Sequence, residues 1–187
     1  VITRPNAQAN ILVGSQGILA EDPRRYAMAV LNTVLGGGMS SRLFQEIREK
    51  RGLAYSVYSF NQGYSDAAYF GLYAGCSPAK TAEVTKLMVA EFEKIATDGI
   101  REDELELAKG NISGSLALKY ESTMGRMNRL ISAEIVNGEF FDLDDSLRHV
   151  HSVTLADVQN LAKDLVARER SIVAVGDVEE STFSAFI

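Results

Sequence analysis

The sequence predicts an α+β fold, in which a mostly antiparallel sheet has its helices packed on one face. Two adjacent segments, 54–60 and 67–76, alternate like the strands of a β-hairpin. Helical apolar patterns then follow one another from 78 to 167, and a short apolar strand at 171–175 comes last. Helices grouped along the chain, rather than alternating with strands, are typical of α+β proteins.

Composition limits the classes of protein to which the chain can belong. Its 187 residues are 46% hydrophobic and 24% charged, which predicts one domain with a substantial core over residues 1–187. The net charge of −6 argues against nucleic acid or an anionic bilayer as a partner. No apolar run approaches the roughly 20 residues of a membrane span, so we expect a soluble chain, with the cytoplasm as the default compartment. Because the chain does not begin with Met, we expect a piece of a longer protein.

The first elements are a strand and a helix. Gln8–Gly17 is a mostly apolar run, which predicts a strand. Asp22 and Pro23 then predict a helix start, with Asp as N-cap and Pro at the first helical position. The helix is expected to run to Leu35 and to present these residues to the core: Tyr26, Val30, Leu31 and Val34.

A Gly-rich turn, Gly36, Gly37 and Gly38, is expected to end this helix. A second, short helix follows, with Ser40 or Ser41 as its N-cap and with Leu43, Phe44 and Ile47 facing the core.

Arg48 falls in the last turn of this short helix. Gly52 occupies the position after the helix that favours a positive φ, and a strand begins at Leu53. The helix end and the strand start therefore bring together the side chains of Arg48 and Tyr55.

The hairpin has a simple predicted pattern. One face of the first strand should carry Ala54, Ser56, Tyr58 and Phe60, and the other face Tyr55, Val57 and Ser59. After a turn at 63–66, Ala68, Phe70, Leu72 and Ala74 should share a face of the returning strand. The aromatic side chains favour core and cross-strand packing over a platform for nucleic-acid bases, since no Lys or Arg is interleaved with them.

The remaining helices are marked by capping residues and apolar stripes. Ser77-Pro78 begins a helix to about Thr97, and the acidic first turn at 102–104 begins the next one, which should end near Tyr120. Three further helices are expected at 122–136, 142–150 and 154–167, with a break at Gly138 and a weak capping box from Thr154 to Asp157. The first of these three is expected to face the core through Met124, Met127, Leu130, Ile131 and Ile135.

The sequence offers no autonomous active site. His149 and His151 are two residues apart, so on a helix they would point roughly 200° apart and could not share a metal ion. We therefore expect no metal site in this chain. Cys76 is the single cysteine, lies in an expected strand and lacks a visible base, so a buried structural thiol is expected.

One stretch of the chain, 34–60, resembles a known family. The glycines at 36–38, a short helix ending at Arg48, and then Leu53, Ala54 and Tyr55 resemble the non-catalytic C-terminal half-domain of the pitrilysin and mitochondrial processing peptidase family of zinc peptidases. In that family a Gly-rich turn, a helix ending in Arg, Leu-Gly-Tyr or Leu-Ala-Tyr and a strand recur in this order. The resemblance extends more loosely over nearly the whole chain and implies the same fold, that of a metallohydrolase half-domain.

The resemblance also implies a role for Arg48 and Tyr55. In the family such a pair reaches toward the zinc site of the other half, binds the substrate backbone and helps to stabilise the oxyanion. Without the resemblance, a structural role is the better interpretation, with Arg48 binding terminal carbonyls and Tyr55 packing its ring. Zinc would belong to an N-terminal catalytic half-domain or a partner subunit, so this chain alone should hold no cofactor and be inactive.

The implied function is one wall of a peptide-binding chamber, with unfolded peptides as substrates held as an added strand at a sheet edge. Two alternatives remain open. One is a non-peptidase scaffold that resembles the core subunits of respiratory complexes, and the other is an unrelated α+β ligand-binding module. Because the surface that closes the chamber would be exposed in the isolated chain, self-association is also expected.

Overall fold

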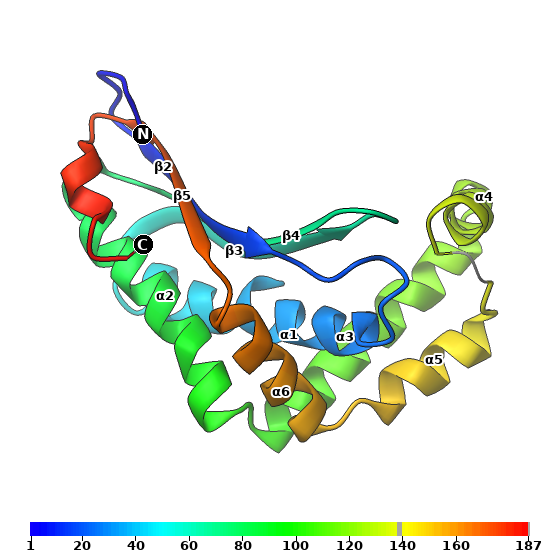
Figure 1. The fold of residues 1–187 in the computed structure, drawn as a ribbon. Coiled ribbons are helices and arrows are strands. Elements are labelled where there is room, and N and C mark those ends of the chain that lie inside the picture. Colours follow the sequence, from blue (N-terminus) through cyan, green and yellow to red (C-terminus); the bar gives the residue numbers. More distant parts are fainter. Residues whose placement is uncertain (138–139, 187) are drawn as a thin grey trace.

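The computed structural model describes residues 1–137 and 140–186, so the expected break at Gly138 lies outside the described residues. Five strands form one sheet in the order β1-β5-β2-β4-β3 (Figure 1). Their bounds are β1 Ile2–Thr3, β2 Ala9–Gln16, β3 Ala54–Gly63, β4 Ala68–Cys76 and β5 Arg170–Gly176. Among the described strands, the short β1 pairs in parallel with β5, whereas the other neighbours are antiparallel. The predicted α+β class and the mostly antiparallel sheet are confirmed.

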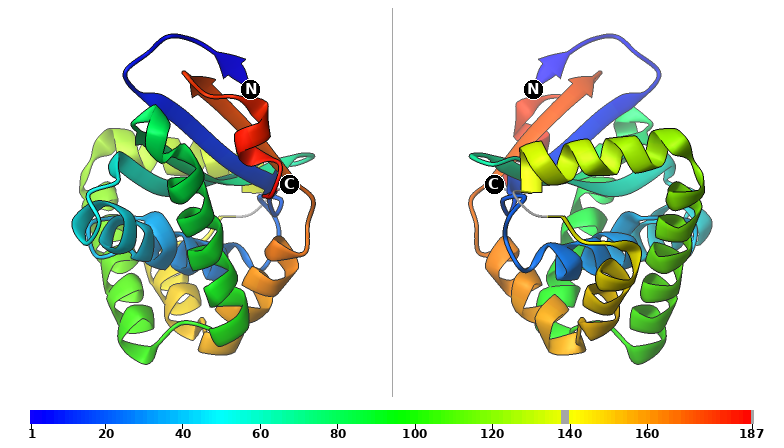
Figure 2. Two further views of the ribbon diagram at one scale, coloured as in Figure 1. Left: turned by 90° about the vertical axis from the view of Figure 1, so that its left-hand side faces the viewer. Right: turned by 90° about the vertical axis from the view of Figure 1, so that its right-hand side faces the viewer.

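The helices cover one face of this sheet (Figures 1 and 2). Their bounds are α1 Arg25–Gly36, α2 Thr81–Asp98, α3 Glu102–Glu121, α4 Thr123–Ser132, α5 Leu143–Ser152 and α6 Leu155–Val166. Shorter elements are the π-helices η1, Phe44–Glu49, and η3, Ala133–Asn137, and the 3₁₀ turns η2, Pro78–Lys80, and η4, Glu180–Phe183. The helix α4 is the exception in position, because it lies at one end of the molecule beyond the tip of the β3–β4 hairpin.

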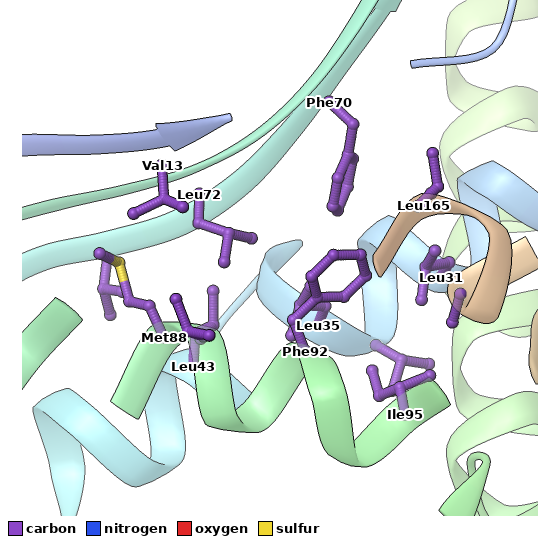
Figure 3. Close-up of a cluster of buried hydrophobic side chains, with 14 of the residues drawn as sticks. Val13, Leu31, Leu35, Leu43, Phe70, Leu72, Met88, Phe92, Ile95 and Leu165 are labelled. Carbon is purple, nitrogen blue, oxygen red and sulfur yellow. The ribbon is translucent and has the colours of Figure 1, made fainter. Parts of the chain in front are cut away.

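The core lies between the sheet and the helices. Side chains from the inner face of β2 and β4 meet side chains from α1, α2 and α6 in Figure 3, which labels Val13, Leu31, Leu35, Leu43, Phe70, Leu72, Met88, Phe92, Ile95 and Leu165. The rings of Phe70 and Phe92 have centroids 5.2 Å apart, which directly joins β4 to α2. Burial of this apolar layer is the main source of stability.

The other face of the sheet is not covered by any helix of the described residues, yet it carries no charged side chain. By strand alternation and register it presents Asn10, Leu12, Gly14, Gln16, Ser56, Tyr58, Phe60, Gln62, Tyr69, Gly71, Tyr73, Gly75, Ser171, Val173 and Val175. The rings of Tyr58 and Tyr73 are in contact, with their centroids 4.8 Å apart and their planes tilted by 31°. Cross-strand aromatic packing is therefore confirmed, but Tyr58 is 44% exposed and does not belong to the core. We call this surface the uncharged sheet face.

Two predicted helix starts need correction. The helix α1 begins at Arg25 rather than Pro23, because the Asp22 carboxylate accepts from the backbone N–H of Arg24 at 2.8 Å and closes a turn before the helix. At the second start, Ser77 and Pro78 open the 3₁₀ turn η2, and the α-helix itself begins later, at Thr81.

The prediction for the helix at 122–136 was wrong in one respect. The helix exists as α4 and η3, but its apolar stripe is exposed to solvent: Met124 60%, Met127 47%, Leu130 58%, Ile131 46% and Ile135 73%. The periodicity correctly indicated a helix with one apolar face, but no part of the described chain covers that face. We call these five residues the α4 apolar face.

The remaining caps follow the sequence. Thr154 and Asp157 form a reciprocal capping box at the start of α6. At the start of α3 the carboxylate of Glu104 accepts from the backbone N–H of Arg101 at 2.8 Å, so the acidic cluster acts as a cap.

Candidate functional site

The short helix that carries Arg48 is anchored at its beginning. Arg42 donates from Nε and Nη2 to both carboxylate oxygens of Glu104, at 2.8 and 2.7 Å, and from Nη2 to the carbonyl oxygen of Gly99 at 3.1 Å. Burial raises the pKa of Glu104, but the hydrogen bonds from Arg42 and from the backbone of Arg101 outweigh it and hold the pKa below its usual value. This ion pair fixes the helix to the start of α3.

The helix itself is not a regular α-helix but the π-helix η1. The backbone N–H of Lys50 donates five residues back, to the carbonyl of Gln45 at 3.0 Å. Glu46 receives hydrogen bonds from Lys50 and Arg51, which hold its pKa below the usual value. The Ser40 or Ser41 cap is not formed as predicted, because the Ser41 hydroxyl donates to the Gly38 carbonyl instead of accepting from the helix.

Arg48 lies in the last turn of η1, as predicted, and is exposed. Its guanidinium carbon lies 5.0 Å from the centre of the Phe44 ring, a cation–π contact that orients the side chain. Within the part of the chain that the structure describes, the guanidinium has no hydrogen bond or ion pair, so its donors are open to a ligand.

Gly52 makes the turn from η1 into β3. It has a φ of 62°, in the left-handed region, and its N–H donates to the Arg48 carbonyl at 3.0 Å. The next N–H, from Leu53, reaches back to the Ile47 carbonyl at 2.9 Å. The predicted positive φ is confirmed, and the strand starts at Ala54, one residue later than predicted.

Tyr55 lies on an irregularity of β3. The register between β3 and β4 shifts at this point, since Ala54 pairs with Cys76 and Ser56 pairs with Gly75, which leaves Tyr55 as the extra residue of a β-bulge. The bulge breaks the predicted alternation, so Tyr55 does not share a face with the buried Val57. Its side chain is 64% exposed.

The two sequence-predicted site residues are therefore both exposed, one just before and one just after the Gly52 turn. Each is carried by a local irregularity, a π-helix for Arg48 and a β-bulge for Tyr55. Such irregularities are frequent at functional sites because they redirect single side chains out of the regular pattern. Sequence periodicity did not reveal either of them.

The Gly-rich turn has a structural explanation at two of its three positions. A Cβ on Gly36 would lie 2.1 Å from the backbone nitrogen of Ser59, so only glycine allows the end of α1 to approach β3 this closely. A Cβ on Gly37 would meet the backbone of Thr33 at 2.6 Å, whereas Gly38 has no atom within 4 Å of that position.

Metal binding has no support among the residues that the structure describes. Among the described residues no group of three or more His, Cys, Asp or Glu side chains is placed to hold a metal ion. His149 and His151 both lie on α5, but His149 stacks on Tyr26 at 4.8 Å and against Phe141 at 4.6 Å, while His151 is exposed. A zinc ion does not fit these residues.

Cys76 is fully buried at the end of β4, as predicted. Burial raises the pKa of its thiol to about 11, so the reactive thiolate is a minor species at neutral pH.

Comparison with known proteins places this geometry in context. The sequence profile of the family described as "Peptidase M16 inactive domain" matches residues 1–112. An uncharacterised zinc protease of Streptomyces coelicolor is 45% identical over 184 residues, which cover 98% of this chain and 40% of that protein. The alpha subunit of the mitochondrial-processing peptidase of Neurospora crassa is 29% identical over 172 residues, 84% of this chain and 30% of that protein.

Solved structures agree on the fold. The peptidase M16 inactive domain from Pseudomonas fluorescens superposes with a TM-score of 0.83 at 26% identity, covering 94% of this chain and 42% of that one. A chain of complex III from Candida albicans superposes with a TM-score of 0.81 at 17% identity, covering 100% of this chain and 46% of that one. At this identity the likeness shows the fold alone.

None of the helices within the described residues combines the length and apolarity needed to cross a bilayer. The motifs between residues 34 and 60, the fold and the matched profile all indicate the same family. This chain spans less than half the length of the curated relatives that it matches. The chain belongs to the family of peptidase M16 inactive domains.

Proposed function

We propose that this chain is the non-catalytic half of a zinc endopeptidase, and that it supplies one wall of the peptide-binding chamber. The observation that carries the proposal is the Arg48–Tyr55 corner, where two exposed donors project from irregular elements around one turn. A guanidinium and a phenol can hold a carbonyl oxygen as negative charge develops on it, without changing their own protonation.

The metal chemistry would come from elsewhere, namely from a catalytic half-domain or a partner subunit. Two exposed surfaces support such a partner. The α4 apolar face and the uncharged sheet face both lack the charged residues that usually cover a solvated surface. In the proposed assembly, these surfaces pack against the other half.

The substrate would be an unfolded peptide bound as an added strand. The strand β3 is at one end of the strand order, and within the described residues it pairs with β4 alone. Its outer edge starts at the bulge that carries Tyr55, so a peptide strand along this edge would pass the two donors.

The test uses the full protein that contains the metal half. Tyr55→Phe should lower turnover by about a hundredfold to a thousandfold and affect ground-state peptide affinity far less, because the lost hydrogen bond is strongest in the transition state. Arg48→Lys should also lower turnover, since an ammonium lacks the planar fork. Tyr64→Phe and Arg51→Lys are matched controls, because Tyr64 is at the hairpin tip and Arg51 is already paired with Glu46.

A scaffold function is the second candidate, favoured by the shared fold with a chain of complex III. If Tyr55→Phe and Arg48→Lys both leave turnover unchanged, the catalytic assignment is refuted. If the full protein shows no peptide hydrolysis at all but remains in a stable assembly, the scaffold function is supported instead.

A further inference from the structure

Arg42 begins the helical turn that leads into η1 and ties this turn to two other helices. Its guanidinium donates to both carboxylate oxygens of Glu104 in the first turn of α3, and to the carbonyl oxygen of Gly99 at the end of α2. The pair is largely shielded from water, since 17% of the Arg42 side chain and 13% of the Glu104 side chain are exposed. A bidentate pair of this kind fixes the orientation of both side chains as well as their distance.

The π-helical form of η1 decides where Arg48 points. The hydrogen bond from the Lys50 N–H to the Gln45 carbonyl spans one residue more than the equivalent bond of an α-helix. Because each residue of an α-helix turns by about 100°, relaxation of η1 to an α-helix would rotate the Arg48 side chain by about that angle relative to Arg42. The direction of Arg48 therefore depends on the contacts that keep η1 in its π-helical form.

The apolar contacts of η1 do not choose between the two forms. Leu43 and Ile47 are fully buried, but hydrophobic contacts have no strong directional preference, and both side chains can be buried from either kind of helix. The choice of form must therefore come from directional contacts, which are the hydrogen bonds at the two ends of the segment.

Directional contacts hold η1 at both ends. At its C-terminal end the N–H groups of Gly52 and Leu53 return to the carbonyls of Arg48 and Ile47, so this end is fixed by the chain itself. At its N-terminal end the three hydrogen bonds of Arg42 connect the segment to α2 and α3. Loss of the Arg42 contacts would free one end of η1 and leave the other end held.

We propose that Arg42 is a positioning residue, whose bidentate pair with Glu104 keeps η1 in the π-helical form that directs Arg48 toward a peptide substrate. The inference rests on the proposed function, because it assigns Arg48 a role at the substrate. Arg42 itself acts through Arg48 and does not touch the peptide.

The first test measures peptide turnover in the full protein that contains the metal half. Arg42→Lys keeps the charge but loses the planar fork, and it should lower turnover by about tenfold, because small displacements of a substrate-binding group are costly in rate. Arg170→Lys is the matched control: Arg170 pairs with Glu93 at 2.8 Å, joins β5 to α2, and has a side chain that is 19% exposed. Arg170→Lys should leave turnover unchanged.

A double-mutant cycle separates positioning from a general loss of structure. If Arg42 acts through Arg48, Arg42→Lys should lower turnover by about tenfold in the wild-type background and by less than about twofold in the Arg48→Ala background. Equal losses in the two backgrounds, with Arg48→Ala itself lowering turnover, would overturn this inference and leave the proposed function intact. Unchanged turnover in Arg48→Ala would instead refute the proposed function, and this inference with it.

Hydrogen exchange of the same full-length variants gives a readout that is independent of activity. Exchange of the Lys50 amide, which is bonded to the Gln45 carbonyl, should be at least severalfold faster in Arg42→Lys than in wild type and unchanged in Arg170→Lys. An unchanged exchange rate at Lys50 in Arg42→Lys would show that Arg42 does not hold η1 in its form, and would overturn the inference whatever the turnover.

Discussion

The close approach of α1 to β3 at Gly36 gives a quantitative prediction. In Gly36→Ala the new Cβ would lie 2.1 Å from the Ser59 nitrogen and 2.7 Å from its hydroxyl oxygen, where ordinary contacts begin near 3.4 Å. The helix end and the strand must therefore separate by about 1 Å, and the hydrogen bond from the Ser59 hydroxyl to the Asn32 carbonyl, at 3.0 Å, is lost or strained.

The cost can be estimated from these contacts. Overpacking of this kind costs about 1–3 kcal/mol, and a lost hydrogen bond costs about 1 kcal/mol. Alanine recovers up to about 1 kcal/mol through its better helix propensity. The net loss for Gly36→Ala is therefore about 2 kcal/mol, which corresponds to a melting temperature lowered by about 4–8 °C for a chain of this length.

Gly38→Ala is the matched control two residues away. A Cβ there meets nothing within 4 Å, and Gly38 does not have a positive φ. Its substitution should be neutral or stabilise by up to about 1 kcal/mol, because alanine lowers the entropy of the unfolded chain. Urea and thermal unfolding followed by circular dichroism measure both variants. Equal stability of Gly36→Ala and Gly38→Ala would refute the predicted clash, because the clash with Ser59 is specific to Gly36.

Three further predictions concern other parts of the chain. Glu104→Gln should lower the free energy of unfolding by about 1–3 kcal/mol at pH 7, because it removes the ion pair with Arg42. Since the pKa of Glu104 is lowered in the folded chain, the difference in stability between variant and wild type, measured by urea unfolding, should shrink as the pH falls below about 4. A difference that stays constant with pH would contradict the lowered pKa. The Cys76 thiol should react with iodoacetamide at pH 8 far more slowly in the folded chain than in urea, since burial raises its pKa to about 11, and equal rates would exclude a buried thiol. The double substitution Met127→Lys and Ile131→Lys should reduce self-association of the isolated chain, measured by sedimentation velocity, and leave its melting temperature nearly unchanged. A large drop in melting temperature would instead show that these side chains pack within the chain.

Much of the fold could be predicted because its signals are local. The positive φ of Gly52 and the capping box of Thr154 and Asp157 each depend on a few adjacent residues. The apolar stripe of α2 packs against the sheet of the same chain, so its periodicity and its burial agree. Where a helix or strand and the surface that it packs against both belong to this chain, hydrophobic periodicity was enough to predict which side chains are buried.

The site could be predicted only in part. Alternation assigns Tyr55 and Val57 to one face, but the extra residue of a bulge follows from the pairing of two strands and cannot be read from one of them. The i to i+5 hydrogen bonds of η1 are similarly invisible to a count of apolar spacing, since Leu43 and Ile47 are buried in either kind of helix. Residue identities therefore pointed to Arg48 and Tyr55, while the geometry that exposes them required the structure.

The error on α4 has a physical cause that bears on the whole protein. A period of 3.6 shows that one face of a helix avoids water, but it does not say which surface covers that face. In α2 the covering surface is this chain's own sheet, whereas in α4 no described residue covers Leu130 or Ile135. The uncharged sheet face has the same property, with Val173 52% exposed. Exposed apolar surface on two separate elements is costly in an isolated domain, and this chain spans only 40% of its Streptomyces relative. Both surfaces are therefore the ones that, in the function proposed above, would pack against the catalytic half.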